Sequence, residues 1–178
     1  MRKTAGPWIL ALGLLGACAH APRSAEHRAD LERSAQNTVQ QMSNQDPNIS
    51  SLMSQAAGYL VFPEVKAGGF IVGGAGGAGI AYQGGQRAGY AELRQASVGA
   101  LAGGQSYAEM IIVRDQHTFD RIKSGDFDVG AQASAVVLKQ GAAAETRFGP
   151  SGLAVLVRPT RGAMVSASLS GQRITIKQ

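Results

Sequence analysis

Residues 67–85, AGGFIVGGAGGAGIAYQGG, constrain the fold more than any other part of the chain, because they combine many glycines with no charged side chain. Within them, residues 74–79 match the G-x-G-x-x-G spacing of a phosphate-binding turn. Three structures are compatible with this composition: a loop that binds a dinucleotide, a helix in a membrane, or β-strands whose backbones pack closely. The residues that follow discriminate among them.

A dinucleotide-binding turn requires a helix directly after its last glycine and an acidic residue about twenty positions further on. Residues 80–83, Ile-Ala-Tyr-Gln, instead predict a strand, and Gly84-Gly85 predicts a turn. No Gly-Lys-Ser/Thr follows, which argues against a Walker-type loop. The spacing match is therefore a coincidence within a glycine-rich sequence, and we expect no nucleotide or other cofactor.

A membrane helix is the second possibility, because Gly69, Gly73 and Gly77 lie four residues apart, a spacing that lets helices pack closely in lipid. The stretch is shorter than the ~20 apolar residues that a membrane span needs, and glycine in a helix costs up to ~1 kcal/mol relative to alanine. We therefore predict a strand, a turn and a strand with close backbone packing, so that Gly76→Val destabilises the fold. A glycine-zipper helix stays open as the alternative.

The first residues predict a targeting segment. Arg2 and Lys3 precede a short apolar run, and Leu15-Gly-Ala-Cys18 resembles the bacterial lipobox. The resemblance implies that residues 1–17 are a signal peptide and that Cys18 receives a diacylglycerol. Ala19 follows where an aspartate would signal retention at the inner membrane, so we expect an outer-membrane location. Cys18 is the sole cysteine, which excludes an internal disulfide and a thiolate metal cluster.

The rest of the chain predicts an α+β fold. Helical periodicity covers residues 24–42, Asp46-Pro47 begins a second helix that Gly58 ends, and Asp115 caps a third helix that Gly125 ends. Strands are predicted at 59–62, 70–72, 90–93, 98–102, 107–113, 133–138, 153–157, 164–169 and 174–176. With the glycine stretch, about nine or ten short strands indicate a predominantly antiparallel sheet, either barrel-like or a sandwich.

Catalytic chemistry has little support in the sequence. The three histidines, His20, His27 and His117, do not lie in a setting that suggests a base for a nearby serine. The aspartates at 115, 120, 126 and 128 lack the spacing and the final glutamate of a calcium loop. We therefore expect no catalytic residue, no metal site and no enzyme activity.

Positive charge is concentrated in the last third of the chain. The formal net charge is +5, and removal of residues 1–17 would lower it to +3. From residue 134 onward six basic side chains face a single acid, Glu145. Such a segment favours anionic surfaces, either membrane headgroups or nucleic acid, and export to the envelope favours lipid. Arg158 and Arg161 flank Pro159-Thr160, a turn on which two guanidinium groups could hold a phosphate.

A string of motifs resembles the SYLF domain, a lipid-binding family that includes a yeast actin-patch protein. The motifs are residues 57–70 (AGYLVFPEVKAGGF), the glycine run, Ser97-Val-Gly99, Gly103-Gly-Gln-Ser106, residues 110–113, 119–122 and 129–134, and residues 161–169 (RGAMVSASL). The resemblance implies a lipid-binding domain over residues 52–178, preceded by residues 18–51 as a lipidated cysteine, a tether and a helical segment.

Combined with the basic segment, the resemblance implies a non-catalytic lipoprotein that binds anionic phospholipid headgroups. The expected lipid contacts are Lys139, Arg158, Arg161, Arg173 and Lys177. We expect no nucleic acid as partner, and no actin in a bacterial envelope. The alternative function is a structural envelope protein that inserts a glycine-zipper segment into the membrane and contacts protein partners.

Overall fold

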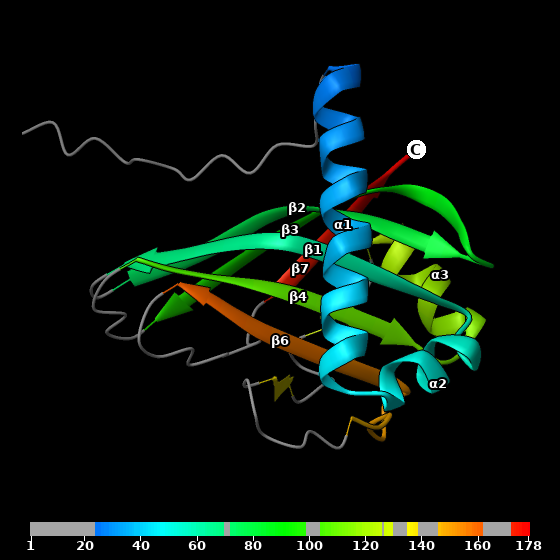
Figure 1. Ribbon diagram of the computed structural model, residues 1–178. Helices are drawn as coiled ribbons and strands as arrows, with labels where there is room; N and C mark the ends of the chain where they lie inside the picture. The colour runs from blue at the N-terminus through cyan, green and yellow to red at the C-terminus, as the bar shows by residue number, and fades with distance from the viewer. Residues whose placement is uncertain are drawn as a thin grey trace, which may run out of the picture.

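The computed structural model describes residues 24–69, 72–98, 104–125, 127–129, 135–138, 146–161 and 172–178. Its helices are α1 (Ala25–Gln45), α2 (Asn48–Ser54) and α3 (Gln116–Ser124). Its strands are β1 (Gly58–Gly69), β2 (Val72–Gln83), β3 (Gln86–Val98), β4 (Gln105–Val113), β5 (Ala135–Val137), β6 (Leu153–Arg161) and β7 (Gln172–Lys177) (Figure 1). The predicted α+β class is confirmed. The strand predicted at 164–169 lies outside the described residues.

Polar side chains begin the helices as their sequence positions predict. The Ser24 hydroxyl accepts the His27 N–H before α1, and Asp46 Oδ1 accepts the Asn48 N–H at 2.9 Å before α2. Asp115 Oδ1 accepts the Thr118 N–H at 2.9 Å at the start of α3, and this bond lowers the pKa of Asp115. Gly125, with a left-handed φ of 82°, ends α3.

The strands form one sheet in the order β5-β6-β4-β1-β2-β3-β7. All neighbours pair antiparallel except β5 and β6, which are parallel. The glycine stretch supplies the end of β1, all of β2 and the two-residue turn Gly84-Gly85, where both φ angles are positive. The predicted strand–turn–strand structure is confirmed, and β2 is a strand where the alternative required a zipper helix.

The number and closure of the strands differ from the prediction. Seven strands are seen in the described ranges, where nine or ten were expected, because β1, β2 and β3 are long and run through residues that were interpreted as punctuation. A β-bulge between Val61 and Glu64 carries β1 past Pro63 without ending it. The sheet ends at β5 and β7, so within the described part it is one open sheet and neither a closed barrel nor a sandwich.

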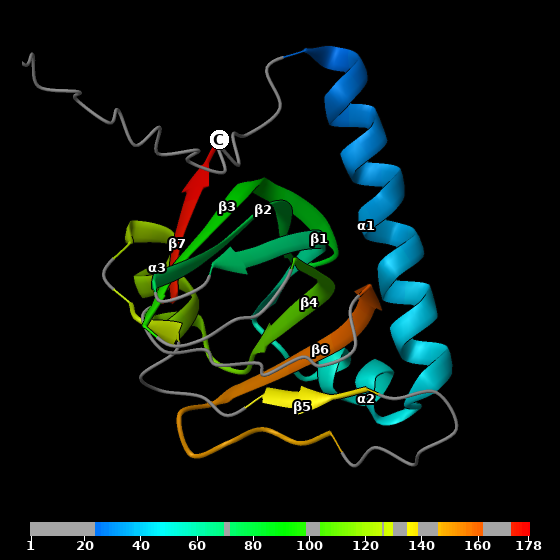
Figure 2. The same cartoon turned by 90° about the vertical axis from the view of Figure 1, so that its left-hand side faces the viewer.

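Two apolar clusters cover the two faces of the sheet. The inner face carries Leu60, Phe62, Leu93, Ile111 and Val155, together with Phe119 and Ile122 of α3. The outer face carries Val61, Ile80, Met110 and Leu156, and packs against Ala35 and Met42 of α1 and Ile49 and Leu52 of α2. The sheet therefore lies between α1 on one side and α3 on the other (Figure 2).

Strong curvature brings the edge strand β7 to the inner side of β4. Gln172 Nε2 on β7 donates to both carboxylate oxygens of Glu109 on β4, at 2.8 and 3.0 Å, and both residues are fully buried. These strands are separated in the sheet order by β1, β2 and β3. The contact is therefore possible because the sheet curves around its inner core.

Two glycines of β2 allow β1 and β2 to pack closely at the bulge. A Cβ at Gly77 would lie 2.7 Å from the carbonyl oxygen of Glu64, and one at Gly79 would lie 2.4 Å from that of Val61. The Phe62 ring fills the remaining space beside Gly79, with its Cδ1 2.5 Å from the same point. The close backbone packing predicted for the glycine stretch is thus located at the inner-facing glycines.

None of the helices in the described ranges is both long enough and apolar enough to cross a membrane.

Candidate functional site

A row of basic side chains crosses the sheet from β6 to β7. The strand pairing places Arg161 on β6 opposite Ser106 on β4, and Ser106 opposite Lys66 on β1. Lys66 in turn lies opposite Gly76 on β2, Gly76 opposite Arg94 on β3, and Arg94 opposite Arg173 on β7. We call Arg161, Lys66, Arg94 and Arg173 the cationic row. Because directly paired residues point to the same face, these four side chains share one face of the sheet.

That face is the outer one. Lys66 follows the inner-facing Val65 on β1, and Gly76 and Arg94 lie an even number of residues from the outer-facing Ile80 and Tyr90. A second, apolar row lies nearer α1. Its members, each paired with the next on neighbouring strands from β6 to β3, are Leu156, Met110, Val61, Ile80 and Tyr90. Helix α1 packs on this apolar row, and the cationic row lies beside it.

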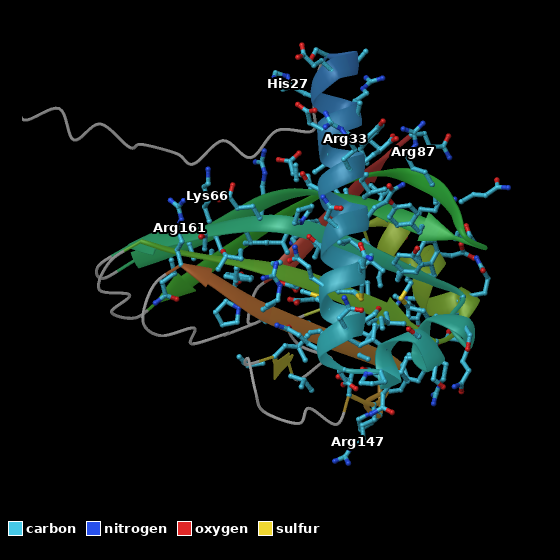
Figure 3. All side chains as sticks on the ribbon, viewed as in Figure 1. His27, Arg33, Lys66, Arg87, Arg147 and Arg161 are labelled. Atoms are coloured by element: carbon cyan, nitrogen blue, oxygen red, sulfur yellow. The ribbon has the colours of Figure 1, made fainter. Side chains whose placement is uncertain are left out.

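The cationic row is exposed to solvent. The side chains of Lys66 and Arg94 are 72% and 67% exposed, and Arg161 and Arg173 are exposed residues. Figure 3 shows Lys66 and Arg161 near each other at the end of the sheet away from α3, whereas Arg147 points away at the opposite side. Along the row, the small buried Ser106 separates Arg161 from Lys66, and Gly76, which has no side chain, separates Lys66 from Arg94.

Three carboxylates, those of Glu64, Glu92 and Asp128, neighbour the row, and its four basic side chains outnumber them. Glu64 lies 3.3 Å from Lys66 Nζ. Glu92, a buried residue, lies 2.5 Å from an Arg94 guanidinium nitrogen and 3.7 Å from Lys177 Nζ. Asp128 forms an isolated β-bridge with Arg173, and in the described part of the chain no ion pair joins a carboxylate to Arg161 or Arg173. The excess positive charge makes the row suited to phosphate or carboxylate ligands.

Arg158 adds an unsatisfied donor next to the row. It pairs with Ala108 and shares its outward direction with the row, but it is partly buried, and its Nε has no hydrogen-bond partner. Thr160 lies between Arg158 and Arg161 in the sequence, and its hydroxyl forms a 3.0 Å hydrogen bond with the Ser106 hydroxyl. A buried guanidinium N–H without a partner is costly, and an anion at this position would satisfy it.

The structure brings together only some of the predicted lipid contacts. Arg161 and Arg173 belong to the cationic row at its two ends, and Arg158 lies beside Arg161. Lys177 lies near the end of β7, opposite Tyr90 and against Glu92. Cys18 and Lys139 lie outside the described residues.

Sequence reasoning missed Lys66 and Arg94. Both occupy polar positions in strands, but Lys66 precedes the glycine-rich segment and Arg94 lies far from the basic C-terminal third. Their place in the row follows from strand register, which aligns residues that are tens of positions apart. Alternation of polar and apolar residues in 90–95 was the one local signal that Arg94 faces solvent.

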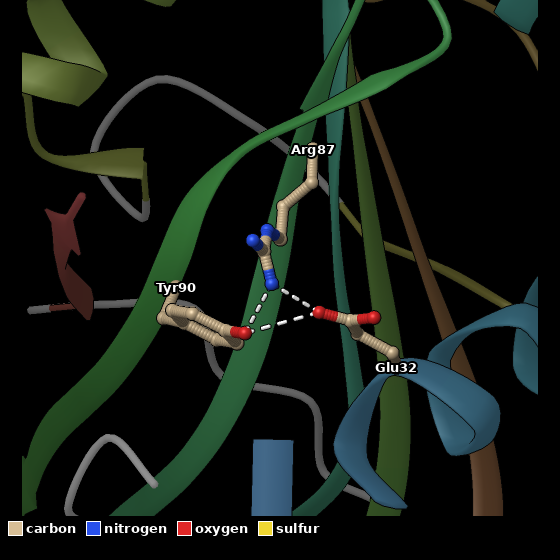
Figure 4. Close-up of polar contacts among 3 residues, drawn as sticks. All are labelled: Glu32, Arg87 and Tyr90. Carbon is tan, nitrogen blue, oxygen red and sulfur yellow. Dashed lines mark hydrogen bonds and ion pairs between the residues drawn. The ribbon is translucent and has the colours of Figure 1, made fainter. Parts of the chain in front are cut away.

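A second polar cluster fixes α1 on the sheet. Glu32 on α1 pairs with Arg87 on β3, and the Tyr90 hydroxyl donates to Glu32 at 3.0 Å (Figure 4). The Arg87 guanidinium also lies over the Tyr90 ring, 4.7 Å from its centroid. Burial raises the pKa of Tyr90, so the phenol stays protonated and keeps its donor. Every group in this cluster has a partner within it, which indicates a structural role.

The buried Glu109 is the remaining unusual group. Burial raises its pKa to about 7, and the hydrogen bond from Gln172 opposes this rise. Its side-chain partner is an amide, which can neither take nor give a proton at neutral pH. Across the described ranges, no group of three or more His, Cys, Asp or Glu residues could hold a metal ion.

Comparison with known families gives one match. Residues 94–178 match the family model described as Ysc84: Las17-binding protein actin regulator. This confirms the resemblance to the SYLF domain family over that part of the chain, which contains Arg94, Arg161 and Arg173 but not Lys66. A search of curated proteins finds no match.

Proposed function

We propose that this chain, whose residues 94–178 match the Ysc84 or SYLF family model, is a non-catalytic lipoprotein that binds anionic phospholipid headgroups at the bacterial envelope. The observation that carries the proposal is the cationic row on the uncovered part of the outer face. Actin regulation is part of the family's description, and we do not extend it to this chain because its N-terminus resembles a bacterial lipoprotein signal.

The charges of the row are distributed along the outer face of the curved sheet. The four basic residues belong to four different strands, so they are spread across the sheet and do not surround a single point. A spread of charge matches a surface of many headgroups better than one small anion. Nucleic acid is the other extended polyanion, and export of the chain would separate it from that partner.

The expected strength follows from the number of cations. A Lys or Arg near an anionic leaflet contributes about 1 kcal/mol to membrane binding, and the attraction decays within a Debye length. Loss of Lys66 and Arg161 should therefore cost about 2 kcal/mol, or about 30-fold in partitioning. Binding through the row should also weaken steeply with salt.

Vesicle flotation tests the proposal directly. The full chain carries Cys18→Ser, so that no lipid is attached, and is mixed with phosphatidylcholine vesicles with or without phosphatidylglycerol. We expect flotation with the anionic vesicles and loss of most of it in Lys66→Gln/Arg161→Gln. The matched control is Lys123→Gln/Arg147→Gln, which removes the same charge from α3 and from the opposite side of the molecule.

Two results would contradict the proposal. Equal flotation with neutral and anionic vesicles would show that headgroup charge is not recognised. Equal losses in the two double variants would show that net charge, and not the cationic row, drives binding. Circular dichroism of each variant should match that of the parent, because all four substituted side chains lie at the surface or partly exposed.

Membrane attachment through Cys18 is the second part of the proposal. A diacylglycerol carries two acyl chains, which is enough for stable attachment, and the basic surface would add attraction to anionic headgroups. In bacteria that export the chain, the protein should therefore sediment with the outer membrane, and the mass of its N-terminal peptide should include a diacylglycerol on residue 18. Recovery of an unmodified Cys18 from the membrane fraction would refute the anchor.

A further inference from the structure

We propose that Glu109 and Gln172 form a proton-operated latch, which holds the edge strand β7 in the curved sheet while Glu109 is protonated and releases it when the carboxylate ionises. The two residues join β4 and β7, which β1, β2 and β3 separate in the sheet order, so their contact closes the curve of the sheet across the inner core. Such a latch controls the position of β7 whatever ligand the outer face binds.

The hydrogen bonds of the pair are complete only when Glu109 carries a proton. Gln172 Nε2 donates to both carboxylate oxygens, and Gln172 Oε1 is buried without a hydrogen-bond partner among the described residues. An ionised carboxylate has no donor to offer that oxygen, whereas a carboxylic acid has one O–H. After a small rotation of the amide, protonated Glu109 can donate to Oε1 while its other oxygen accepts from Nε2. Protonation thus supplies the donor that the buried amide oxygen lacks.

The neighbours of Glu109 on its own and adjacent strands oppose its ionised form. Glu109 is fully buried, and the residues paired with it on β1 and β6 are the apolar Phe62 and Val157. Tyr107 is the titratable neighbour on β4, and burial raises its pKa, so it stays an uncharged phenol. Burial raises the pKa of Glu109 to about 7, which places its change of charge near neutral pH.

The other elements around the inner core place apolar or amide groups toward it. Strand β3 contributes Leu93, β7 contributes Ile174 beside Gln172, and α3 contributes Phe119 and Ile122. The charged and titratable side chains of these elements and of residues 127–129 face the outer side of the sheet or are exposed or partly exposed; they are Glu92, Arg94, His117, Asp120, Arg121, Lys123, Asp128, Arg173 and Lys177. The proton on Glu109 is therefore governed mainly by burial and by Gln172.

Strand β7 is the element that the latch can release. It has six residues and ends the sheet, and within the described ranges its strand partner is β3, with one further bridge between Asp128 and Arg173. Strand β4 is held on both sides, by β1 and by β6. Because separation of β7 from β3 lets water reach Glu109 at the loss of one strand pair, ionisation favours movement of β7 and not of β4.

Hydrogen exchange measures the release directly and needs no lipid. The full chain with Cys18→Ser is exchanged at pH 5 and pH 8, and each rate is compared with the intrinsic rate of an unstructured chain at that pH. If Glu109 regains its ordinary pKa when β7 opens, protection of the β7 amides should fall by up to about 70-fold between these pH values. The amides of β6, which pairs with β4 and β5, should keep their protection.

Two variants distinguish the latch from other titrating groups. Glu109→Gln cannot ionise and can still form an amide–amide hydrogen bond with Gln172, so its β7 protection should be equal at the two pH values. Gln172→Met has a similar size but removes the hydrogen bond that favours the ionised carboxylate, so the fall in protection should move to higher pH. Constant β7 protection in the parent chain, an equal fall in β6, or a fall that persists in Glu109→Gln would overturn the latch.

Release of β7 should also weaken the cationic row, because Arg173 lies on β7 opposite Arg94. At pH 8, Glu109→Gln should bind vesicles that contain phosphatidylglycerol about fivefold more tightly than the parent, and at pH 5 the two should bind equally. This comparison rests on the proposed function, whereas hydrogen exchange does not. Absence of binding by both proteins would overturn the proposed function alone, and equal binding at pH 8 would overturn the link between the latch and the row.

Discussion

Gly79→Ala tests whether close packing between β1 and β2 is what the glycine stretch provides. The added Cβ would lie 2.4 Å from the Val61 carbonyl oxygen and 2.5 Å from Cδ1 of Phe62, and real Cβ atoms essentially never come within 3.0 Å of other heavy atoms. The oxygen belongs to the backbone at the bulge, and the ring is fully buried in the inner core. Neither can move without shifting its neighbours.

The magnitude is set by two opposing effects. Overpacking of this kind costs about 1–3 kcal/mol, whereas replacing glycine by alanine stabilises by about 0.4–1 kcal/mol through the unfolded chain. Because the contact is with backbone as well as with a ring, we expect the upper part of the range, a net loss of about 2 kcal/mol. For a chain of 178 residues this lowers the melting temperature by about 4–8 °C.

Gly68→Ala is the matched control. Gly68 lies on β1 in the same stretch, its φ is outside the left-handed region, and a Cβ there would meet no atom within 4 Å. The unfolding free energy of the Gly68→Ala variant should equal that of the parent chain or be slightly higher. Urea unfolding followed by circular dichroism measures both variants, and a Gly79→Ala variant as stable as Gly68→Ala would refute the packing argument. Gly76, where a substitution was first expected to matter, faces outward and is a less direct probe of this contact.

Two further predictions concern buried and half-buried charges. Burial raises the pKa of Glu109 to about 7, above its value in the unfolded chain, so its contribution to stability is full below about pH 4.5 and is lost as pH rises through about 7. That contribution amounts to about 3 kcal/mol, and Glu109→Gln should remove this slope from urea unfolding measured across the same pH range; an unchanged slope would assign it to other groups. A double-mutant cycle of Glu32→Gln and Arg87→Gln should give a coupling of about 0.5–1 kcal/mol, because the pair is half-exposed, and a value near zero would remove it as the contact that fixes α1.

Local chemistry was sufficient to predict most of the fold. The capping roles of Asp46 and Asp115, the stop at Gly125 and the strand structure of the glycine stretch all follow from interactions within a few residues. Over the described residues the strand count differs from the prediction, and one reason is the bulge that carries β1 through Pro63. Whether a chain ends or bulges at a proline depends on the partner strand.

The candidate site was predictable only in part, for a related reason. A surplus of basic residues near the C-terminus is visible in composition, and it led to Arg161 and Arg173. Lys66 joins them through β4 on one side and β2 on the other, so its role depends on the register of several strand pairs. Register is set by packing of the whole sheet, and a shift of one residue would turn Lys66 to the inner face.

The pairing of Arg94 with Arg173 is the part of the site that stability alone does not explain. Like charges directly opposite each other on neighbouring strands are destabilising, and the nearby carboxylates are Glu92, which pairs with Arg94, and Asp128, which forms an isolated β-bridge with Arg173. A residue pair that costs stability on an exposed face needs a compensating role, and an anion bound between the two guanidinium groups would provide one. We therefore expect Arg173→Gln to raise the unfolding free energy slightly while weakening binding to anionic vesicles. If the variant has a lower unfolding free energy as well as weaker binding, Arg173 supports the fold.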